Sequence, residues 1–201
     1  MLYDVGDLQN ELLVRGNRTT TDSFVTDTIL NDWIRQSHRW AAGYRKWPLT
    51  EGRVSTTFAS LVTDDEGLLR GEYPEGWRPD SIRYLLIGGK RVLKKNYYKF
   101  REYLERNEDS ATRVFTDLGR SYYVNPSIDL SGTIVVIGQY SPAIDPTDKT
   151  AVTIFSDIDE TANEEILEKM MAFLKRREHD VTEAELHDKR AKEILEEIWK
   201  N

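Results

Sequence analysis

The chain of 201 residues contains no cysteine, only three histidines, and no apolar run close to the roughly 20 residues that cross a bilayer as a helix. The absence of cysteine excludes disulfides, thiolate chemistry and zinc sites with cysteine ligands. The acidic N-terminal stretch MLYDVGDLQNELL lacks the basic start of a signal peptide. We therefore expect no membrane association and no signal peptide, and the composition fits a cytosolic protein.

Sequence motifs for catalysis and nucleotide binding are missing as well. There is no G-x-S-x-G nucleophile motif, and the GGK segment at 88–90 lacks the spacing of a phosphate loop, so it predicts a hairpin turn. His179, Glu183 and His187 have the spacing of one helical stripe. Two turns of helix would separate these histidines by about 12 Å, too far for one metal ion. We expect no catalytic residue, no metal ion and no cofactor.

Charge is unevenly distributed along the chain, whose formal net charge is −7. The last 45 residues, from Asp157 to Asn201, hold 14 acidic and 8 basic residues, whereas the stretch from Arg83 to Arg101 holds seven basic residues and no acidic one. This segregation is compatible with head-to-tail association of identical subunits, in which unlike patches meet. The alternative is a solvated helix face together with a local basic patch.

Three of the five tryptophans fall in the stretch from Thr21 to Gly52. Val25, Ile29 and Trp33 recur at every fourth position, which predicts a helix with one apolar face, and Pro48 would end it. A shorter helix is predicted before it. Because large buried aromatic side chains stabilise a core strongly, we expect the sheet and the last helices to pack against the tryptophan-rich helix.

Short strands are predicted throughout residues 53–140. Alternating apolar residues over 81–87 lead into the Gly88-Gly89 pair, which is typical of a β-hairpin. A second hairpin is predicted at the DLGR turn of residues 117–120, and one short helix over 96–107. Short strands separated by turns favour an antiparallel sheet or a small sandwich.

The C-terminal part is predicted to be helical after a last strand over 151–155. Thr161 with Glu164, and Thr182 with Glu185, are capping boxes that indicate two helix starts. The pattern leaves open whether residues 157–200 form a helical pair or one long helix. The predicted fold class is α+β, as a single compact unit with a helical extension. Its segments are an N-terminal helical segment (1–52), a mostly β domain with one short helix (53–155), and C-terminal helices that pack on the N-terminal helix (156–201).

The stretch TDTILNDWIRQSHRWAAGYRKWPLTEG resembles the N-terminal helix of tailed-bacteriophage head–tail connector proteins, also called adaptor or neck proteins. His38 departs from the aromatic residue expected at that position of the pattern. Further segments that are similar in style are YPEGWRPDSIRYLLIGGKR, VFTDLGRSYYVNP, GTIVVIGQY and EEILEKMMAFLKRREHD, so the resemblance covers most of the chain. The residues that fit the helix pattern are Leu30, Asn31, Trp33, Ile34, Arg39, Trp40, Trp47 and Pro48.

The resemblance implies a structural virion protein at the head–tail junction, and not an enzyme. Such adaptors form a homo-oligomeric ring, usually of twelve copies, that joins the portal protein to tail or nozzle proteins. They line part of the channel, so double-stranded DNA would pass during genome ejection without sequence-specific binding, and no membrane is involved. Synthesis would take place in the host cytoplasm. The alternatives are a tail-terminator or other tail structural protein, which usually has larger sheets, and then a small nucleic-acid-associated protein.

The resemblance carries over no catalytic residue, so the functional candidates are interface residues. The basic run interleaves with aromatic residues, as in nucleic-acid contacts, but the acidic balance of the chain disfavours that role. We expect charge reversal in the run to weaken assembly on the portal, and the acids of the last helices are candidates for the channel lining. The candidate interface residues are Arg83, Lys90, Arg91, Lys94, Lys95, Lys99, Arg101, Glu193, Glu196, Glu197 and Trp199.

Overall fold

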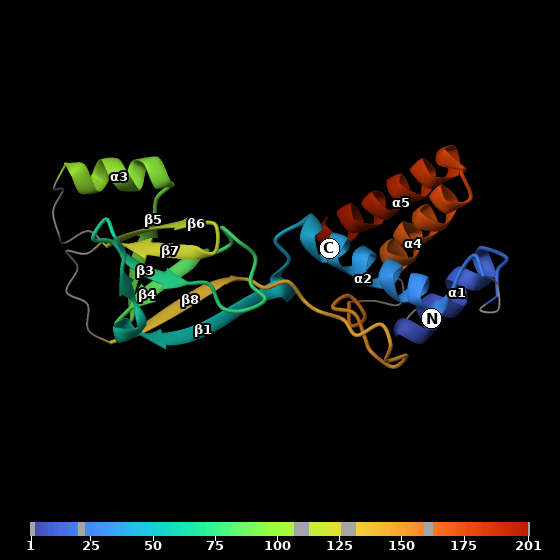
Figure 1. Ribbon diagram of the computed structural model, residues 1–201, viewed down its shortest axis with the longest axis horizontal. Coiled ribbons are helices and arrows are strands. Elements are labelled where there is room, and N and C mark those ends of the chain that lie inside the picture. Colours follow the sequence, from blue (N-terminus) through green and yellow to red (C-terminus); the bar gives the residue numbers. More distant parts are fainter. Residues whose placement is uncertain (1–2, 20–22, 107–112, 126–131, 159–162, 201) are drawn as a thin grey trace. The chain divides into compact units, whose positions relative to one another are not determined.

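A computed structural model describes residues 3–19, 23–106, 113–125, 132–158 and 163–200 (Figure 1). The chain forms two compact units. The helical unit comprises Met1–Leu49 and Pro142–Asn201, and the β unit comprises Thr50–Ser141. Helix accounts for 44% of the structure and strand for 23%, which confirms the α+β class and disfavours a mostly-strand architecture.

One helix is central to the helical unit. Helix α4 contacts α1, α2 and α5. Ile166, Leu167, Met170 and Leu174 recur at intervals of one to four residues along α4, and each is at least 99% buried. Helix α4 thus takes the central place that the sequence pattern predicted for the tryptophan-rich helix α2. The helices of this unit are α1 (Val5–Arg15), α2 (Asp27–Tyr44), α4 (Glu164–Arg177) and α5 (Val181–Lys200).

The tryptophan-rich stretch forms a helix that is shorter than predicted, from Asp27 to Tyr44. Trp47 follows the helix and folds back on it, because its indole N–H donates to the carbonyl oxygen of Ala41 (3.0 Å). Its ring packs edge-on against Phe155, with 5.6 Å between the ring centroids. The last tryptophan of the stretch therefore joins α2 to the segment that leads into α4.

The C-terminal residues form two helices, which answers the question that the sequence left open. His179 has a φ of 63°, and this left-handed residue ends the path of α4. The carboxylate of Asp180 accepts a hydrogen bond from the backbone amide of Glu183 (3.1 Å). Asp180, and not the predicted Thr182, therefore caps the start of α5.

Residues 151–155 were expected to be a strand, and this prediction is wrong. Val152 forms only an isolated bridge to Asp4. The backbone amide of Val5 donates to the carbonyl oxygen of Ala151 (2.9 Å). The segment therefore pairs with the start of α1, within the helical unit, and does not join the sheet.

The β unit is one curled sheet of eight strands, in the order β1-β8-β4-β5-β6-β7-β3-β2. All neighbours are antiparallel except β5 and β6, where Leu93 lies opposite Val114 in a parallel pair. Helix α3 (Tyr97–Glu105) connects these two strands, and parallel neighbours need such a crossover. The prediction of a purely antiparallel sheet is therefore wrong at this pair. The strands are β1 (Glu51–Thr57), β2 (Val62–Thr63), β3 (Leu69–Glu72), β4 (Tyr84–Ile87), β5 (Lys90–Lys94), β6 (Val114–Leu118), β7 (Ser121–Val124) and β8 (Thr133–Gln139).

Both predicted hairpin turns are present. Gly88 and Gly89, with φ of 55° and 75°, connect β4 to β5, and Gly119, with φ of 61°, connects β6 to β7. Glycine adopts such positive φ values without the steric cost that other residues have. These turns set the register of the two hairpins.

The sheet curls around an aromatic core of its own, separate from the core of the helical unit. A Cβ atom added at Gly71 would lie 2.2 Å from the ring of Tyr122, and one at Gly138 would lie 2.8 Å from the ring of Trp77. Both aromatic side chains are buried. Glycine at these two positions therefore lets the backbone wrap closely around the rings.

Candidate interaction surfaces

The seven predicted basic candidates all lie on the β unit, at or between β4 and α3. Three of them form ion pairs with acidic residues that are distant in sequence. Three of the seven positive charges of the run are thus compensated within the unit. The pairs are Arg83 with Glu51 (2.5 Å between nitrogen and oxygen), Lys94 with Asp117 (2.6 Å) and Arg101 with Glu66.

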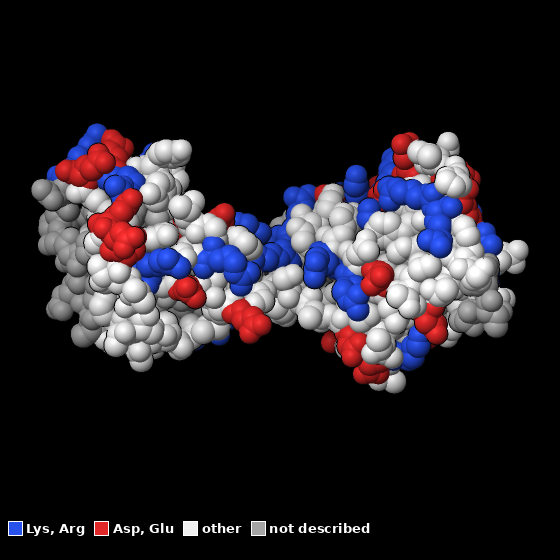
Figure 2. Space-filling model, in the orientation of Figure 1, with Lys and Arg blue, Asp and Glu red and all other residues white. Residues whose placement is uncertain are grey.

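Two further cations of the run, Arg91 and Lys95, lie over tyrosine rings, 4.7 and 5.3 Å from the ring centroids. Lys90 and Lys99 are exposed, and within the described residues neither forms an ion pair. Figure 2 shows basic and acidic side chains interspersed on the visible face of α3. Three of the seven positive charges are thus compensated by acids, and with the acidic balance of the chain this disfavours the nucleic-acid alternative.

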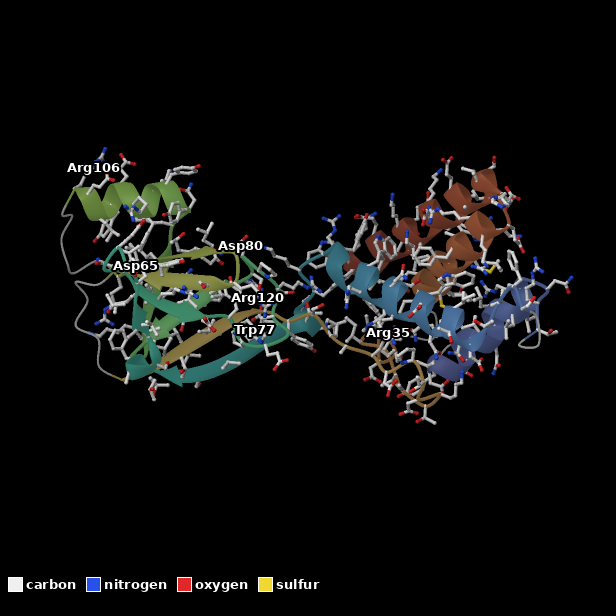
Figure 3. The ribbon with its side chains drawn as sticks, in the orientation of Figure 1. Arg35, Asp65, Trp77, Asp80, Arg106 and Arg120 are labelled. Atoms are coloured by element: carbon white, nitrogen blue, oxygen red, sulfur yellow. The ribbon has the colours of Figure 1, made fainter. Side chains whose placement is uncertain are left out.

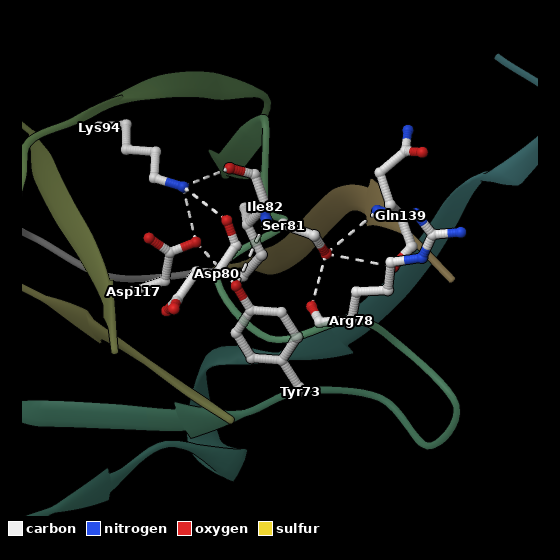
Figure 4. Close-up of polar contacts among 8 residues, drawn as sticks. All are labelled: Tyr73, Arg78, Asp80, Ser81, Ile82, Lys94, Asp117 and Gln139. Carbon is white, nitrogen blue, oxygen red and sulfur yellow. Dashed lines mark hydrogen bonds and ion pairs between the residues drawn. The ribbon is translucent and has the colours of Figure 1, made fainter. Parts of the chain in front are cut away.

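A polar junction of Tyr73, Ile82, Lys94 and Asp117 fixes the loop before β4 (Figure 4). The Lys94 ammonium donates to the Asp117 carboxylate (2.6 Å) and to the Ile82 carbonyl (2.9 Å). The Tyr73 hydroxyl donates to the same carboxylate (2.7 Å) and accepts from the Ile82 amide (3.3 Å). Burial, and then the hydrogen bond to Asp117, raises the pKa of Tyr73. Lys94 therefore has a structural role within the β unit.

A second group of hydrogen bonds holds the same loop against β8 (Figure 4). The Ser81 hydroxyl donates to the Arg78 carbonyl (2.7 Å) and accepts from the backbone amide of Gln139 (3.2 Å). The side-chain carbonyl of Gln139 accepts from the hydroxyl of Thr50 (2.5 Å). The hydroxyl groups of Tyr73 and Ser81 are thus committed to internal contacts.

Different side chains lie toward the two ends of the β unit. Figure 3 shows Trp77, Asp80 and Arg120 toward one end and Asp65 and Arg106 toward the other. The first end carries the polar junction, whose groups satisfy one another.

A groove of about 570 Å³ opens between β1 and β3, near the two ends of the curled sheet. Apolar side chains, among them Val54, Val62 and Tyr122, line it together with Asp64 and Glu72. The sequence did not reveal this groove, because it depends on where the ends of the sheet meet in space. The available signal was the valines of the strand-like segment RVSTTFASLV, which remain exposed in the folded chain.

The acidic candidates lie together with Trp199 near the end of α5. The carboxylate of Glu196 accepts from the guanidinium of Arg45 (2.5 Å) and from the hydroxyl of Tyr44 (2.9 Å). These hydrogen bonds, the one from Arg45 first, lower the pKa of Glu196. Glu196 therefore joins α5 to the end of α2.

The other three candidates on α5 are more accessible. Trp199 packs edge-on against Trp47, with 5.4 Å between the ring centroids, and leaves 43% of its surface exposed. Glu193 and Glu197 are exposed, and Glu193 lies 3.7 Å from Lys189. These side chains could contact a partner without disturbing the α2–α5 packing.

The histidine spacing does not produce a single stripe, because His179 lies in the turn before α5. The Nδ1 atom of His187 is 2.6 Å from the carboxylate of Glu168 on α4. Across the described ranges, no group of three or more histidine and acidic side chains could hold a metal ion. In the same part of the chain, no helix is both long enough and apolar enough to cross a membrane.

These surfaces can be set beside known protein families. A family model described as SU10 adaptor protein matches residues 3–201 of the chain. A search of curated proteins finds no match. The family match spans both the helical unit and the β unit, so it concerns the whole chain.

Proposed function

The chain belongs to the SU10 adaptor protein family, a family of bacteriophage head–tail adaptors, and from this premise we propose that it forms a ring that joins the portal protein to tail or nozzle proteins. Membership makes it a structural phage protein and a component of the virion. The ring is expected to be closed and to hold about twelve copies at the head–tail junction. The observation that carries the proposal is the family match across residues 3–201.

The charged candidates fit different parts of such a ring. Glu193 and Glu197 are exposed acids on the last helix. If they face the channel, they repel the phosphates of passing DNA and keep it from binding, which suits genome ejection without sequence recognition. Lys90 and Arg91, at the exposed β4–β5 hairpin, are the basic candidates best placed to meet an acidic surface of the portal.

The portal contact is tested by reversing these two charges. We expect Lys90→Glu with Arg91→Glu to weaken assembly on the portal, with a loss that grows as the salt concentration falls. Lys192→Glu, which changes an exposed lysine of the helical unit, serves as the matched control. Unchanged assembly of the double variant would count against an interface in the basic run.

The ring itself is tested by measuring mass with light scattering, for the chain alone and after mixing with the portal ring. We expect a monomer of 23.4 kDa alone that joins the portal in about twelve copies. That result would mean that the portal templates the ring. A ring that forms without the portal would be consistent with a virion protein, but it would also be consistent with a tail-terminator or other tail structural protein. A monomer that ignores the portal would contradict the proposal.

A further inference from the structure

We propose that Tyr98 of one copy inserts into the groove between β1 and β3 of the next copy, so that neighbouring β units are joined by a knob on α3 and a hollow in the sheet. This proposal rests on the proposed ring and names the contact that holds its neighbours together. Three observations support it. They are an exposed tyrosine on an anchored helix, a groove between two open strand edges, and a base beside the tyrosine with acids beside the groove.

The knob is an exposed side chain on an anchored helix, with the ring of Tyr97 edge-on beside it (6.1 Å between the ring centroids). Tyr98 is the most exposed of the large hydrophobic side chains in the described residues, at 84%. Helix α3 holds it in place, because Phe100 and Tyr103 of the same helix are buried. The side chain of Asn96 caps the first turn by accepting the backbone amide of Lys99 (2.9 Å). A tyrosine side chain has only two side-chain torsions, so it loses little conformational entropy on binding, and tyrosines are enriched at interface centres.

The hollow suits an aromatic ring. Val54, Pro74, Tyr122 and Val136 contribute its apolar lining, and the volume of about 570 Å³ leaves room for a side chain of that size. Val54 is 36% exposed at this position. Insertion of a partner's ring would therefore remove apolar surface on both sides from water.

The groove remains open because the strand edges beside it do not pair. Antiparallel alternation directs the backbone groups of Arg53 and Ser55 away from β8. On the other side, β2 pairs with β3 only at Leu69 and Arg70, so Glu72 lies beyond the end of β2. In the described part of the chain no strand covers these edges. Open edges of this kind favour contact with a second chain.

Opposite charges accompany the knob and the hollow. Lys99 follows Tyr98, is exposed, and forms no ion pair among the described residues. Asp64, Arg70 and Glu72 line the groove, so its acids outnumber its one base, and Glu72 leaves 79% of its side chain exposed although it pairs with Arg70 (3.1 Å). An inserted Tyr98 would bring Lys99 toward these acids, and such complementarity fixes the orientation of a contact.

The occupant is a second copy of this chain. Tyr98 does not fill the groove of its own β unit, because most of its surface is in solvent. Knob and hollow are different surfaces of one unit, so a contact between them is heterologous. Heterologous contacts close into rings when the rotation between neighbours allows it, which is the assembly proposed above.

The contact is tested by photo-cross-linking in rings assembled on the portal. The chain would carry p-benzoylphenylalanine in place of Tyr98, which keeps an aromatic ring at the position. We expect covalent dimers and larger multimers of the chain, with the cross-linked peptide drawn from residues 54–74 of the neighbour. The same probe in place of Lys192, an exposed residue of the helical unit, is the control and should not label that segment.

Substitutions give an independent test. Tyr98→Ala should reduce ring assembly on the order of tenfold, and Tyr98→Phe should retain it, because the contact is apolar. Lys99→Glu and Glu72→Lys should each weaken assembly, and both changes in one chain should restore it, because every contact then regains opposite charges. Circular dichroism checks that these exposed substitutions leave the fold intact.

The outcomes separate this contact from the ring itself. If rings form but the probe labels another segment, the portal or a tail protein, the contact is overturned and the ring stands. Normal assembly of Tyr98→Ala would have the same meaning. If the unmodified chain forms no ring on the portal, both proposals are overturned.

Discussion

The helical unit packs its helices around one apolar core, whereas the β unit is a sheet with a groove beside its β1 edge. In the helical unit, charged side chains bridge separate elements around the apolar core. In the β unit, the sheet ends without a partner at β1 and presents both a groove and Tyr98 to solvent. Both units carry exposed apolar side chains, among them Val14 and Trp199 in the helical unit, but the β unit combines a groove with an exposed tyrosine, which is the basis of the proposed contact between copies. The bridging pairs of the helical unit include Arg15 with Glu164, Arg18 with Glu178, Arg45 with Glu196 and Lys169 with Asp188.

Those ion pairs do not account for the stability of the helical unit. Most of the partners are partly exposed, and such pairs typically contribute about 0–1 kcal/mol each. The apolar side chains around α4 are fully buried, and each contributes about 1.5–3 kcal/mol. The helical unit should therefore be sensitive to changes in its core and tolerant of changes in its surface charges.

The largest expected effect is a loss of stability that is confined to the helical unit. Phe155 is fully buried and packs against Trp47. Phe155→Ala should lower the free energy of unfolding by about 3–5 kcal/mol, because it leaves a cavity where the loop meets the core. Hydrogen exchange followed by mass spectrometry should show faster exchange in α2 and α4 and unchanged protection in β4 and β8. Equal loss of protection in both units would mean that they unfold as one.

The next effect is a pH dependence of stability, which we expect in the helical unit because all three histidines lie there. His38 is buried, its Nε2 atom accepts the backbone amide of Ile154 (3.5 Å), and burial lowers its pKa to about 4. In the unfolded chain His38 is protonated below about pH 6.5, whereas in the folded chain it stays neutral until the pH is close to 4. Above pH 6.5 His38 therefore does not lower the free energy of unfolding. As the pH falls from 6.5 toward 4, the free energy of unfolding decreases by about 3 kcal/mol.

Urea unfolding of the parent chain and of His38→Gln at pH 7.5 and pH 4.5 measures this term. Carboxylates titrate in both proteins, so the difference between the two pH dependences isolates His38. The parent should lose more stability than the variant as the pH falls. Equal losses would contradict the assignment to His38. Hydrogen exchange should place the effect in the helical unit.

Local sequence patterns predicted the elements better than their pairing. The α+β class, the two hairpin turns and the separation of strand-rich and helix-rich segments follow from periodicity and glycine positions. The parallel β5–β6 pair does not, because the choice of neighbour after a crossover depends on tertiary packing. The same holds for α4, whose central place results from which helices it meets and not from its own pattern.

For the candidate surfaces too, the sequence predicted segments better than the contacts between them. The sequence identified the basic run but not its partners, since Glu51 and Glu66 lie more than 30 residues away from Arg83 and Arg101. The sequence places Tyr98 among the aromatic residues of the basic run but does not predict its exposure, because the face of the helix that packs decides which side chains are exposed. Residues from several separate strands line the groove, so no local sequence pattern could predict it.

The smallest expected effect compares one glycine from each unit. Gly71→Ala in the β unit would place Cβ 2.2 Å from the ring of Tyr122, and forcing the buried ring aside should cost about 1–3 kcal/mol. Gly43→Ala in α2 meets no atom within 4 Å and should stabilise the helix by about 0.5–1 kcal/mol. Thermal unfolding should therefore shift in opposite directions for the two variants. A loss of stability in both would mean that the α2 surface near Gly43 is less open than described, and a gain in both would mean that Tyr122 moves aside easily and that the core beside the groove adapts to small changes.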